Sequence, residues 1–401
     1  MRILFIAMSH SIHTARWINQ LNGQGWDIHL FPSIDVPPAH PDLKNVTVHH
    51  TFYGRRKSRD KSIELRGIPV ISEHAAFVCR QALKTLWPDC RRLYLRDLTK
   101  RLQPDIIHSL EMQAAGYLTM DVRRRYEGQF PPWIYSSWGS DLYFFGRYPK
   151  HQAKIREVLA SCDYYVADCQ RDVELAARYG FRGESLGVFP SVGGFDISGM
   201  RRWLQPGPVS ARRLIALKGY IGWAGRANVA LQALQLCAEA LKGYTVALYL
   251  ASSEVKKMAR HVASVTEAPF TILPPSPNQE IIRLMGSSRI AIGVSVTDGT
   301  PISMLETMAM GAFPIQSNTI STAEWITNGE NGMLVPPEDP QAIAAAIKRA
   351  LSDDSLVDRA AEINLRLTSE RIDRSVIQPQ VIAMYEKIAA NVSKHKRQAN
   401  T

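Results

Sequence analysis

The sequence lacks any uninterrupted apolar run of about 18 residues, the length that a membrane-spanning helix requires. It therefore predicts no transmembrane segment. The apolar stretch at residues 3–7 is too short for a signal peptide, and it continues into the polar Ser9-His10-Ser11 instead of a cleavage site. We interpret it as a first β-strand, and we expect the protein in the cytoplasm or at the inner face of the membrane.

Cysteine is also scarce in this chain of 401 residues. The five cysteines are odd in number, and they show none of the close paired spacings of a zinc site or a disulfide framework. This pattern indicates a reducing compartment, which agrees with a cytoplasmic location. The cysteines are Cys79, Cys90, Cys162, Cys169 and Cys237.

Positive charge, by contrast, is abundant. The net charge is +11, and the segment from Arg55 to Arg101 holds 13 Lys and Arg against 5 Asp and Glu. A basic helical face is predicted by cations spaced near a helical turn, namely Arg91, Arg92, Arg96, Lys100 and Arg101. Such a face suits an anionic membrane or a nucleic acid, and a solvated surface explains it equally well. No nucleic-acid-binding motif accompanies it, so we expect no nucleic acid partner and keep that class as a weaker alternative.

Short apolar runs alternate with longer amphipathic segments, the pattern of parallel sheets covered by helices. The runs form two series, separated by turn-rich stretches at residues 191–196 and 205–208. The sequence therefore predicts an α/β protein of two Rossmann-like domains with a cleft between them, and ligands at the carboxyl ends of the strands. The predicted strands are residues 3–7, 27–31, 105–108, 133–137, 164–167 and 187–189, then 214–217, 245–250, 270–273, 290–296 and 313–316.

The segment from Ser295 to Gly311 carries the clearest chemical signal. Thr300 followed by Pro301 predicts a helix start, with the threonine hydroxyl as the N-cap and the proline at the first helical position. Backbone N–H groups and the helix dipole would form an anion site there, which fits a diphosphate. Asp298 lies just before this helix, and Glu306 within it could accept hydrogen bonds from both hydroxyls of a ribose. A plainer interpretation makes Asp298 part of the cap and Glu306 a solvated helix residue.

The same segment resembles the signature of the family-4 retaining glycosyltransferases, which have the GT-B fold. That signature has two glutamates separated by seven residues, followed by a Leu-Glu-Ala-Met-Ala-x-Gly-x-Pro pattern. Asp298, in place of the first glutamate, and Glu306 keep the spacing here, and residues 305–315 look like the pattern. Residues 328–337 and 104–108 are also similar to segments of the family. The resemblance covers most of the chain and is strongest over residues 290–347.

The resemblance implies transfer of a sugar from a nucleoside-diphosphate sugar, with UDP as the first expectation, to a hydroxyl of a glycan or lipid-linked acceptor. It implies an acceptor-side domain over residues 1–195 and a donor domain over 205–369, with a helix at about 370–392 that packs back on the first domain. Glu306 would bind the ribose, and Asp298 would approach the donor sugar with one methylene less reach than glutamate. The remaining donor-binding residues would be Gly299, Thr300, Pro301, Ile302 and Ser303.

The family also places two cations near the start of its C-terminal domain. Lys218 ends the first strand of the second series and Arg226 opens the next helix, so we expect both at the diphosphate. Positive charge there would stabilise the departing nucleoside diphosphate. A surface lysine and a helix arginine are the plainer alternative.

Three loops of the N-terminal half are expected to face the acceptor. Residues 135–141 resemble the family's His-Gly-x-Asp loop, with Trp138 in place of the histidine, so no catalytic histidine is carried over. Asp141 would orient or deprotonate the acceptor hydroxyl, or else cap the segment that follows. The other candidate acceptor and cleft residues are Ser9, His10, His13, Gly139, Ser140, Gly193 and Gly194.

Two motifs are absent from the sequence, and each absence argues against one kind of site: a divalent metal site in the first case and a dinucleotide-binding site in the second. No Asp-x-Asp occurs in the chain, although a divalent cation that holds a nucleotide-sugar needs clustered oxygens, so we expect no metal and no other cofactor. No Gly-x-Gly-x-x-Gly follows the first strand, which disfavours a nicotinamide-dependent oxidoreductase. A GT-B nucleotide-sugar epimerase remains an alternative. The favoured hypothesis is a metal-independent retaining hexosyltransferase of bacterial cell-envelope polysaccharide or glycolipid synthesis.

Overall fold

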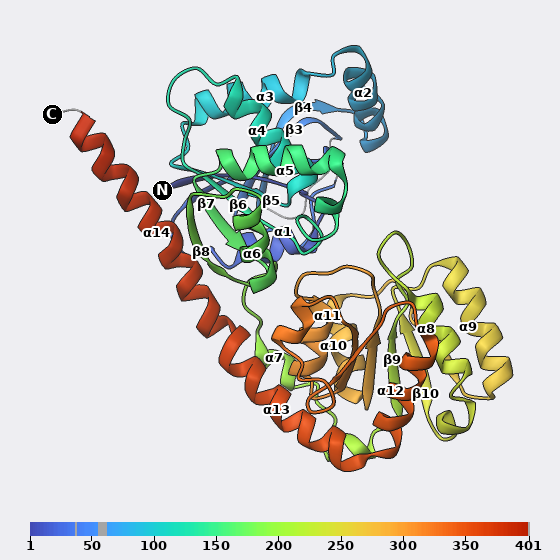
Figure 1. The fold of residues 1–401 in the computed structure, drawn as a ribbon. Coiled ribbons are helices and arrows are strands. Elements are labelled where there is room, and N and C mark those ends of the chain that lie inside the picture. Colours follow the sequence, from blue (N-terminus) through green and yellow to red (C-terminus); the bar gives the residue numbers. More distant parts are fainter. Residues whose placement is uncertain (37, 55–61, 400–401) are drawn as a thin grey trace. The chain divides into compact units, whose positions relative to one another are not determined.

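Two parallel β-sheets organise the polypeptide, which a computed structural model describes over residues 1–36, 38–54 and 62–399 (Figure 1). The chain divides into two units: unit 1 holds Met1–Gly194 and the residues from Ile377 onward, and unit 2 holds Phe195–Val376. The boundary falls in the turn-rich stretch at residues 191–196, whereas the stretch at 205–208 lies inside unit 2. The predicted basic run from Arg55 to Lys61 lies outside the described residues.

In the described residues of unit 1, eight strands form a sheet of order β4-β3-β2-β1-β5-β6-β7-β8, and the neighbouring strands are parallel. The strands β3 and β4 were not predicted from the sequence pattern. The strands are β1 (Arg2–Ala7), β2 (Asp27–Pro32), β3 (Val46–Gly54), β4 (Ile63–Val70), β5 (Ile106–Leu110), β6 (Trp133–Ser136), β7 (Tyr164–Ala167) and β8 (Glu184–Val188).

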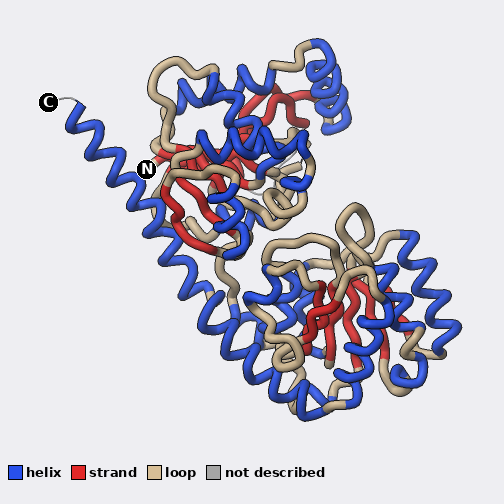
Figure 2. The backbone as a smooth tube through the Cα atoms, in the orientation of Figure 1, coloured by secondary structure: helices blue, strands red, loops and turns tan. Residues whose placement is uncertain are grey.

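The central strand β1 explains why the first apolar stretch is uninterrupted. Residues 3–7 are completely buried, because helices cover both faces of the sheet (Figure 2). Phe5 belongs to the core on one face, whereas Leu4 and Ile6 belong to the core on the other. The helices of unit 1 are α1 (Ile12–Asn19), α2 (Glu73–Leu86), α3 (Cys90–Leu102), α4 (Tyr117–Arg124), α5 (Pro149–Ser161), α6 (Gln170–Arg178) and most of α14 (Arg374–Ala399).

The C-terminal helix α14 supplies part of the core of unit 1. Tyr385 is fully buried in the same cluster as Phe5 and Trp17. The indole Nε1 of Trp17 donates a hydrogen bond of 3.0 Å to the Tyr385 hydroxyl, which also lies 2.6 Å from Nδ1 of His108. A buried polar group of this kind is costly unless it is hydrogen-bonded, so these contacts fix the position of α14 on unit 1.

Replacement of Tyr385 with phenylalanine should therefore lower stability. The substitution keeps the ring but leaves the buried Trp17 N–H without its acceptor, a loss of about 1–3 kcal/mol in the free energy of unfolding. Urea denaturation would measure this loss. Tyr148→Phe is the matched control, because Tyr148 is 48% exposed, and its stability should equal that of the wild type. Equal stability of both variants would contradict the anchoring role of Tyr385.

In the described residues of unit 2, six strands form a parallel sheet of order β11-β10-β9-β12-β13-β14. The strand β14 was not predicted, and β12 ends three residues before the predicted end because Ser295 forms an antiparallel bridge with Gly225. The strands are β9 (Leu214–Lys218), β10 (Thr245–Tyr249), β11 (Phe270–Ile272), β12 (Ile290–Gly293), β13 (Phe313–Ser317) and β14 (Met333–Val335).

Helices cover both faces of this second sheet as well. One core contains residues of α8, α9 and α12 together with the inward residues of β9, β10 and β12, and a smaller core contains residues of α10. The helices of unit 2 are α7 (Ile197–Arg201), α8 (Ala227–Gln235), α9 (Ser253–Thr266), α10 (Asn278–Ser287), α11 (Ile302–Ala309), α12 (Pro340–Ser352) and α13 (Asp354–Ile372). Across the residues that the structure describes, no helix has the length and apolar character needed to cross a bilayer.

Candidate functional site

The loops at the carboxyl ends of β9 and β12 lie side by side in unit 2. The strands are neighbours in the sheet, and parallel strands place their carboxyl ends at the same edge. Backbone hydrogen bonds join the loops directly: Arg226 N donates to Val294 O, and Val296 N donates to Ala224 O, each at 2.9 Å. Two predicted groups of residues that are far apart in sequence, Lys218 with Arg226 and Asp298 with its helix, therefore lie at one edge.

The helix after Asp298 begins one residue later than predicted. Its N-cap is Pro301, with φ −63° and ψ 116°, and the helix runs from Ile302. Thr300 is therefore not the N-cap but a buried loop residue, and Ser303 lies in the first turn. Such a shift is within the usual uncertainty of a helix end, and the amino-terminal end of α11 still lies beside Asp298.

Hydrogen bonds hold the Asp298 loop in a fixed conformation. Gly299 N donates to Oδ1 of Asp298 at 3.0 Å, and the hydroxyl of Ser321 donates to Gly299 O at 2.6 Å. Asp298 is half-buried, whereas Gly299 is buried. A loop at a helix N-terminus that is already held in place is suited to an anionic ligand, because binding then costs little conformational entropy for ordering the loop.

Glu306 is a buried carboxylate and not a solvated helix residue. Its side chain is in the second turn of α11, and the residue is 4% exposed. Nδ2 of Asn278, at the start of α10, donates a hydrogen bond of 2.9 Å to Oε1 of Glu306. Burial first, and then the nearby Glu306 charge, raise the pKa of Tyr249 at the end of β10. The plainer interpretation of Glu306 is therefore wrong, because a buried carboxylate requires specific partners.

The two predicted cations differ in their surroundings. Lys218 is the last residue of β9, half-buried, and lies directly opposite Tyr249 in the strand register. Arg226 is the N-cap residue of α8, and its Nε lies 3.0 Å from Oε1 of Glu338. Nη1 of Arg226 also donates to Gly225 O at 3.0 Å. The guanidinium is thus held at the loop by a carboxylate that is itself mostly exposed.

Sequence reasoning missed three polar partners at this edge: Tyr249, Asn278 and Glu338. Tyr249 is the last residue of β10, Asn278 is the first residue of α10, and Glu338 lies between β14 and α12, so position near the carboxyl end of a strand was the available signal. The pairings themselves carry no sequence signal, because Asn278 and Glu306 are 28 residues apart and Arg226 and Glu338 are 112 apart.

In unit 1, three loops at the carboxyl edge of the sheet meet around His13. Nδ1 of His13 lies 3.2 Å from the Ser191 hydroxyl, and the ring centroids of His13 and Trp138 are 5.4 Å apart. His13 follows β1, Trp138 follows β6 and Ser191 follows β8, so the fold gathers the predicted acceptor loops. The partly exposed His13 and Trp138 are therefore available to a ligand at this edge.

The other predicted residues of this group differ in exposure. Ser9 is buried and its carbonyl accepts the N–H of His40, whereas His10 is exposed. Gly193 has φ +71°, and a Cβ there would meet the Gln20 side chain at 2.3 Å, so this position requires glycine. Gly194 and Ser140 are half-buried, and Gly139 is buried.

Asp141 is engaged inside unit 1. Its Oδ2 accepts a hydrogen bond from the Tyr135 hydroxyl at 3.0 Å and from Trp138 N at 2.8 Å. Nη2 of Arg171 donates to Gly139 O at 2.7 Å and holds the same loop from the other side. Burial, and then the neighbouring Glu111, raise the pKa of Asp141. These contacts fix the turn that presents Trp138.

Glu111 is a second buried carboxylate that the sequence did not indicate. It follows β5 with a left-handed backbone, φ +77°, and accepts the backbone N–H groups of Gln113, Ala114 and Ala115 at 2.6–2.8 Å. Burial raises its pKa to about 7, against the opposing effect of the three N–H donors. A non-glycine residue in this conformation is held by its surroundings, and here the three hydrogen bonds hold it.

This pKa predicts a pH dependence of stability. The folded protein holds the Glu111 proton more tightly than the unfolded chain, whose pKa is 4.5, so the stabilisation is complete below pH 4.5 and is lost as the pH rises through 7. Across that window the wild type should lose on the order of 3 kcal/mol more than Glu111→Gln, as measured by urea denaturation.

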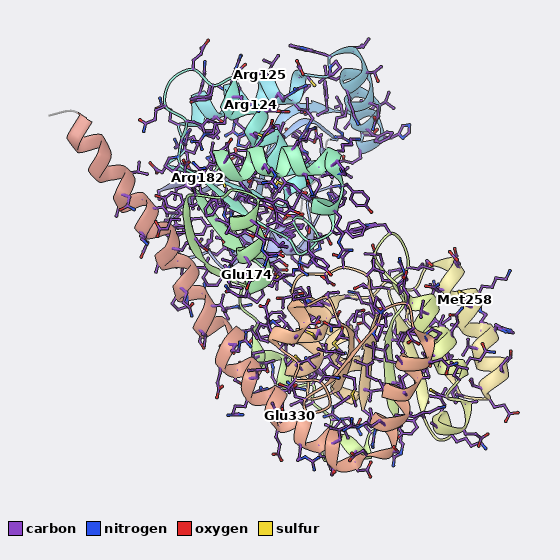
Figure 3. All side chains as sticks on the ribbon, viewed as in Figure 1. Arg124, Arg125, Glu174, Arg182, Met258 and Glu330 are labelled. Atoms are coloured by element: carbon purple, nitrogen blue, oxygen red, sulfur yellow. The ribbon has the colours of Figure 1, made fainter. Side chains whose placement is uncertain are left out.

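The control is Glu174→Gln, since Glu174 is an exposed glutamate of α6 labelled in Figure 3. Its dependence on pH should match that of the wild type. Parallel curves for the wild type and Glu111→Gln would show that Glu111 is ionised throughout the window.

Comparison with known proteins agrees with this geometry. The family model described as glycosyl transferase 4-like matches residues 2–74 and 82–167, and the model described as glycosyl transferases group 1 matches residues 218–353. An exopolysaccharide phosphotransferase from Streptomyces coelicolor is 34% identical over 77 residues, which are 18% of this chain and only 8% of that protein.

Solved structures are similar over nearly the whole chain. Sucrose-phosphate synthase from Thermosynechococcus elongatus superimposes with a TM-score of 0.68 at 14% identity, covering 98% of this chain and 100% of that one. HepE from Anabaena, solved with UDP-glucose, gives 0.65 at 16% identity, with the same coverages. Both domains of the GT-B fold are thus present, and the predicted fold class is confirmed. From its sequence motifs, its two matching models and its fold, the chain belongs to the family-4 glycosyltransferases.

Proposed function

We propose that this protein transfers a hexose from a UDP-sugar to an acceptor hydroxyl with retention of configuration. The observation that carries the proposal is Glu306, a carboxylate buried at the helix beside the Asp298 loop and held by Asn278. A carboxylate in that position would accept hydrogen bonds from the two hydroxyls of a ribose, and a nucleotide contains such a ribose. The choice of UDP is supported by HepE, whose structure was solved with UDP-glucose.

The diphosphate would lie between the amino-terminal end of α11 and the two cations. The backbone N–H of Ser303 in the first turn of α11, together with Lys218 and Arg226, would supply positive charge to the leaving group as its bond to the sugar breaks. Asp298 would approach a hydroxyl of the sugar. Lys218 ends β9, and Arg226 lies in the following loop, whose backbone is hydrogen-bonded to the segment that precedes Asp298; this arrangement supports a common site for these groups at one edge of the sheet.

For the base, we propose the leaving phosphate and not Asp141. Both the Tyr135 hydroxyl and Trp138 N donate to Oδ2 of Asp141, and the residue is buried. Asp141 then acts as a positioning residue for the Trp138 loop, while a phosphate oxygen accepts the proton of the incoming acceptor hydroxyl on the same face of the sugar. His13 and Trp138 would contact the acceptor, a glycan or a lipid-linked saccharide of envelope polysaccharide or glycolipid synthesis.

We also propose that transfer needs no metal ion, since protein cations and helix amides supply the positive charge that a divalent ion otherwise brings. Treatment with EDTA, followed by gel filtration, should leave turnover unchanged within about twofold, and added Mg²⁺ or Mn²⁺ should not raise it. A loss of activity that Mn²⁺ restores would overturn this part of the proposal.

The function itself is tested by a panel of UDP, GDP, ADP and NAD in a thermal-unfolding assay. A ligand at 100 times its dissociation constant adds about 2.7 kcal/mol of stability, which is readily measured. We expect stabilisation by UDP, and ¹H NMR of the transfer product should show the anomeric configuration of the donor. Product formed without any acceptor would favour an epimerase instead, and stabilisation by NAD alone would exclude the proposal.

A further inference from the structure

A pocket of about 760 Å³ lies in unit 1 between the sheet and α3. That volume is within the range of sites for small molecules. Three neighbouring strands, β2, β3 and β4, form its floor, and α3 forms its wall. We call it the α3 pocket; the polar residues of its floor include Asp27, His29, Thr47, His49, Glu64 and Arg66.

The polar floor results from the alternation of side chains along each strand. On β3, Val46 and Val48 belong to the core that includes α1 and α14, whereas Thr47 and His49 lie on the opposite face and line the pocket. Both faces of a parallel sheet are usually apolar, because helices cover them. The polar face of these three strands is therefore a departure from that pattern, and packing of the core does not require it.

The register of the strands sets the floor residues side by side. His29 lies opposite Thr47, and Thr47 lies opposite Glu64, so three polar groups form a row across the sheet. His49 lies opposite Arg66 in the next row on this face. The Thr47 hydroxyl donates to Oε2 of Glu64 at 3.3 Å, which orients the carboxylate. The floor thus holds hydrogen-bonding groups at defined positions.

Asp27, His29 and His49 form a chain of polar contacts that ends in the pocket. Nε2 of His29 lies 3.0 Å from Oδ1 of Asp27, and Nδ1 of His29 lies 3.0 Å from Nε2 of His49. Burial first, and then the charge of His29, lower the pKa of His49 to about 4, so this imidazole is neutral at neutral pH. Because a carboxylate only accepts, His29 donates from Nε2 and accepts from His49 at Nδ1. Nδ1 of His49 is then an acceptor for a ligand hydroxyl.

The hydroxyl of Thr51 also indicates a ligand. It is buried, it lines the α3 pocket, and it has no hydrogen-bond partner among the residues that the structure describes. Buried polar atoms of proteins are almost always hydrogen-bonded. A hydroxyl group in the pocket would satisfy this one.

The basic face that the sequence predicted on α3 is mostly neutralised. Arg91 is turned inward, since its Nη1 lies 3.1 Å from Oδ2 of Asp35, and the prediction of Arg91 as a surface cation is therefore wrong. Contact of the remaining face with an anionic membrane stays a prediction. The neighbouring cations each form an ion pair with a carboxylate: Arg92 with Asp89, Arg96 with Asp97, and Lys100 with Glu127.

Arg101, the last cation of this face, lines the α3 pocket and forms no ion pair within the described part of the chain. The two carboxylates of the floor are already neutralised by other cations. Nε of Arg2 lies 2.6 Å from Oδ2 of Asp27, and Nη2 of Arg66 lies 2.5 Å from Oε1 of Glu64. The pocket therefore has one surplus positive charge, and a guanidinium is suited to a carboxylate or a phosphate.

Apolar groups complete the lining. Leu98 and Leu102 of α3 and Ile68 of β4 line the pocket beside the ring of Tyr94. A ligand that fits this lining has an apolar face, several hydroxyls and one acidic group. A sugar ring supplies the first two through its C–H groups and its hydroxyls.

We propose that the α3 pocket binds an acidic sugar, a saccharide that carries a carboxylate or a phosphate. The acidic group lies at Arg101, and the hydroxyls of the sugar are hydrogen-bonded to Glu64, His49 and Thr51. This chemistry is the same whether the acid is a carboxylate or a phosphate, so the experiment includes one probe of each kind.

The α3 pocket is separate from the candidate acceptor site. Asp27 and Glu64 lie at the amino-terminal ends of β2 and β4, whereas His13 and Trp138 follow the carboxyl ends of β1 and β6. Because the strands are parallel, these are opposite edges of the sheet. The inference therefore does not rest on the proposed transfer reaction.

Isothermal titration calorimetry tests the proposal with glucuronate, glucose-6-phosphate, glucose and inorganic phosphate as probes. We expect the wild type to bind at least one of the two acidic sugars. Glucose and inorganic phosphate should bind about tenfold or more weakly, because each lacks part of the contacts. Binding of glucuronate alone would identify a carboxylate as the group at Arg101, and binding of the sugar phosphate alone would identify a phosphate.

Arg101→Gln should weaken binding of the acidic sugar by about tenfold or more, because it removes the charged hydrogen-bond donor. Ile68→Asp places a carboxylate at a position of the pocket that is 55% exposed, and its repulsion should also weaken binding. The matched control is Arg182→Gln. Arg182 is an exposed arginine that precedes β8, at the edge of the sheet opposite β4, and is labelled in Figure 3; this variant should bind as the wild type does.

Binding by folded Arg101→Gln and Ile68→Asp variants that equals binding by the wild type would place the ligand elsewhere and overturn the proposal. A wild type that binds neither acidic sugar would also overturn it, as would one that binds glucose or inorganic phosphate equally well. Affinity for UDP should be the same in Arg101→Gln and in the wild type, so failure of this proposal is distinguishable from failure of the proposed donor site.

Discussion

Glu306→Ala is expected to abolish stabilisation by UDP in the thermal-unfolding assay. The substitution removes the carboxylate that we propose accepts both ribose hydroxyls. Each charge-assisted hydrogen bond is worth about 1.5–3 kcal/mol, so the loss of two lowers affinity by roughly 10²-fold or more. Isothermal titration calorimetry with UDP measures this loss directly. Transfer activity should fall in parallel, because donor binding precedes the chemical step.

The structure supplies two controls for this experiment. Glu330→Ala removes an exposed glutamate that precedes β14 in unit 2 and is labelled in Figure 3, and it should bind UDP as the wild type does. Asn278→Ala removes the donor to Glu306 without removing the carboxylate, and it should weaken binding less than Glu306→Ala. UDP affinity that survives in a folded Glu306→Ala variant would refute the ribose contact while leaving the family assignment intact.

The second large effect, a fall in kcat, is expected when either of the two cations proposed at the diphosphate is replaced. Lys218→Ala and Arg226→Ala should each lower kcat by about 10²–10³, the usual cost of removing one group that stabilises charge in a transition state. KM for the donor should change less, because the charge on the phosphate is greatest as the sugar bond breaks. Steady-state kinetics with UDP-glucose and a soluble acceptor give both constants.

Arg226 has a matched control in its ion-pair partner. Glu338→Ala breaks the contact of 3.0 Å to Nε of Arg226 but leaves the guanidinium in the loop. If Arg226 acts on the phosphate, this variant should keep kcat within a fewfold of the wild type. A fall equal to that of Arg226→Ala would mean that the ion pair holds the loop and that the cation has no direct part in the reaction.

The alternation of apolar runs predicted the buried strands well and the peripheral strands poorly. A central parallel strand is covered on both faces, so residues 3–7 of β1 and all of β12 are apolar and stand out in the sequence. The strand β4, at the edge of the first sheet, is mostly exposed and contains Glu64, Arg66 and Gly67. Its residues satisfy backbone pairing without a continuous core face, and no periodicity marks them.

The site was predictable where one local segment contains its chemistry. Asp298 lies just before α11 and Glu306 lies within it, so the local pattern predicted their positions, and the resemblance to the family supplied their proposed roles. Contacts between segments were not, because Asn278 meets Glu306 and Arg226 meets Glu338 only after the sheet has ordered its strands. Whether Glu306 is buried was likewise undecided by helical position, since the burial depends on α10.

The position of α14 has a consequence for the order in which the protein is completed during translation. Residues 1–194 leave the ribosome first, yet the core of that unit includes Val381 and Tyr385, which are made only after the whole of unit 2. Unit 2 is continuous in sequence and can close while the chain is still growing. Of the two units, unit 1 is thus synthesised first, but its core is completed last. Until α14 has been synthesised, the Trp17 N–H lacks the Tyr385 hydroxyl as its hydrogen-bond acceptor. A premature stop codon just beyond unit 2 would therefore leave the core of unit 1 without the residues that α14 supplies.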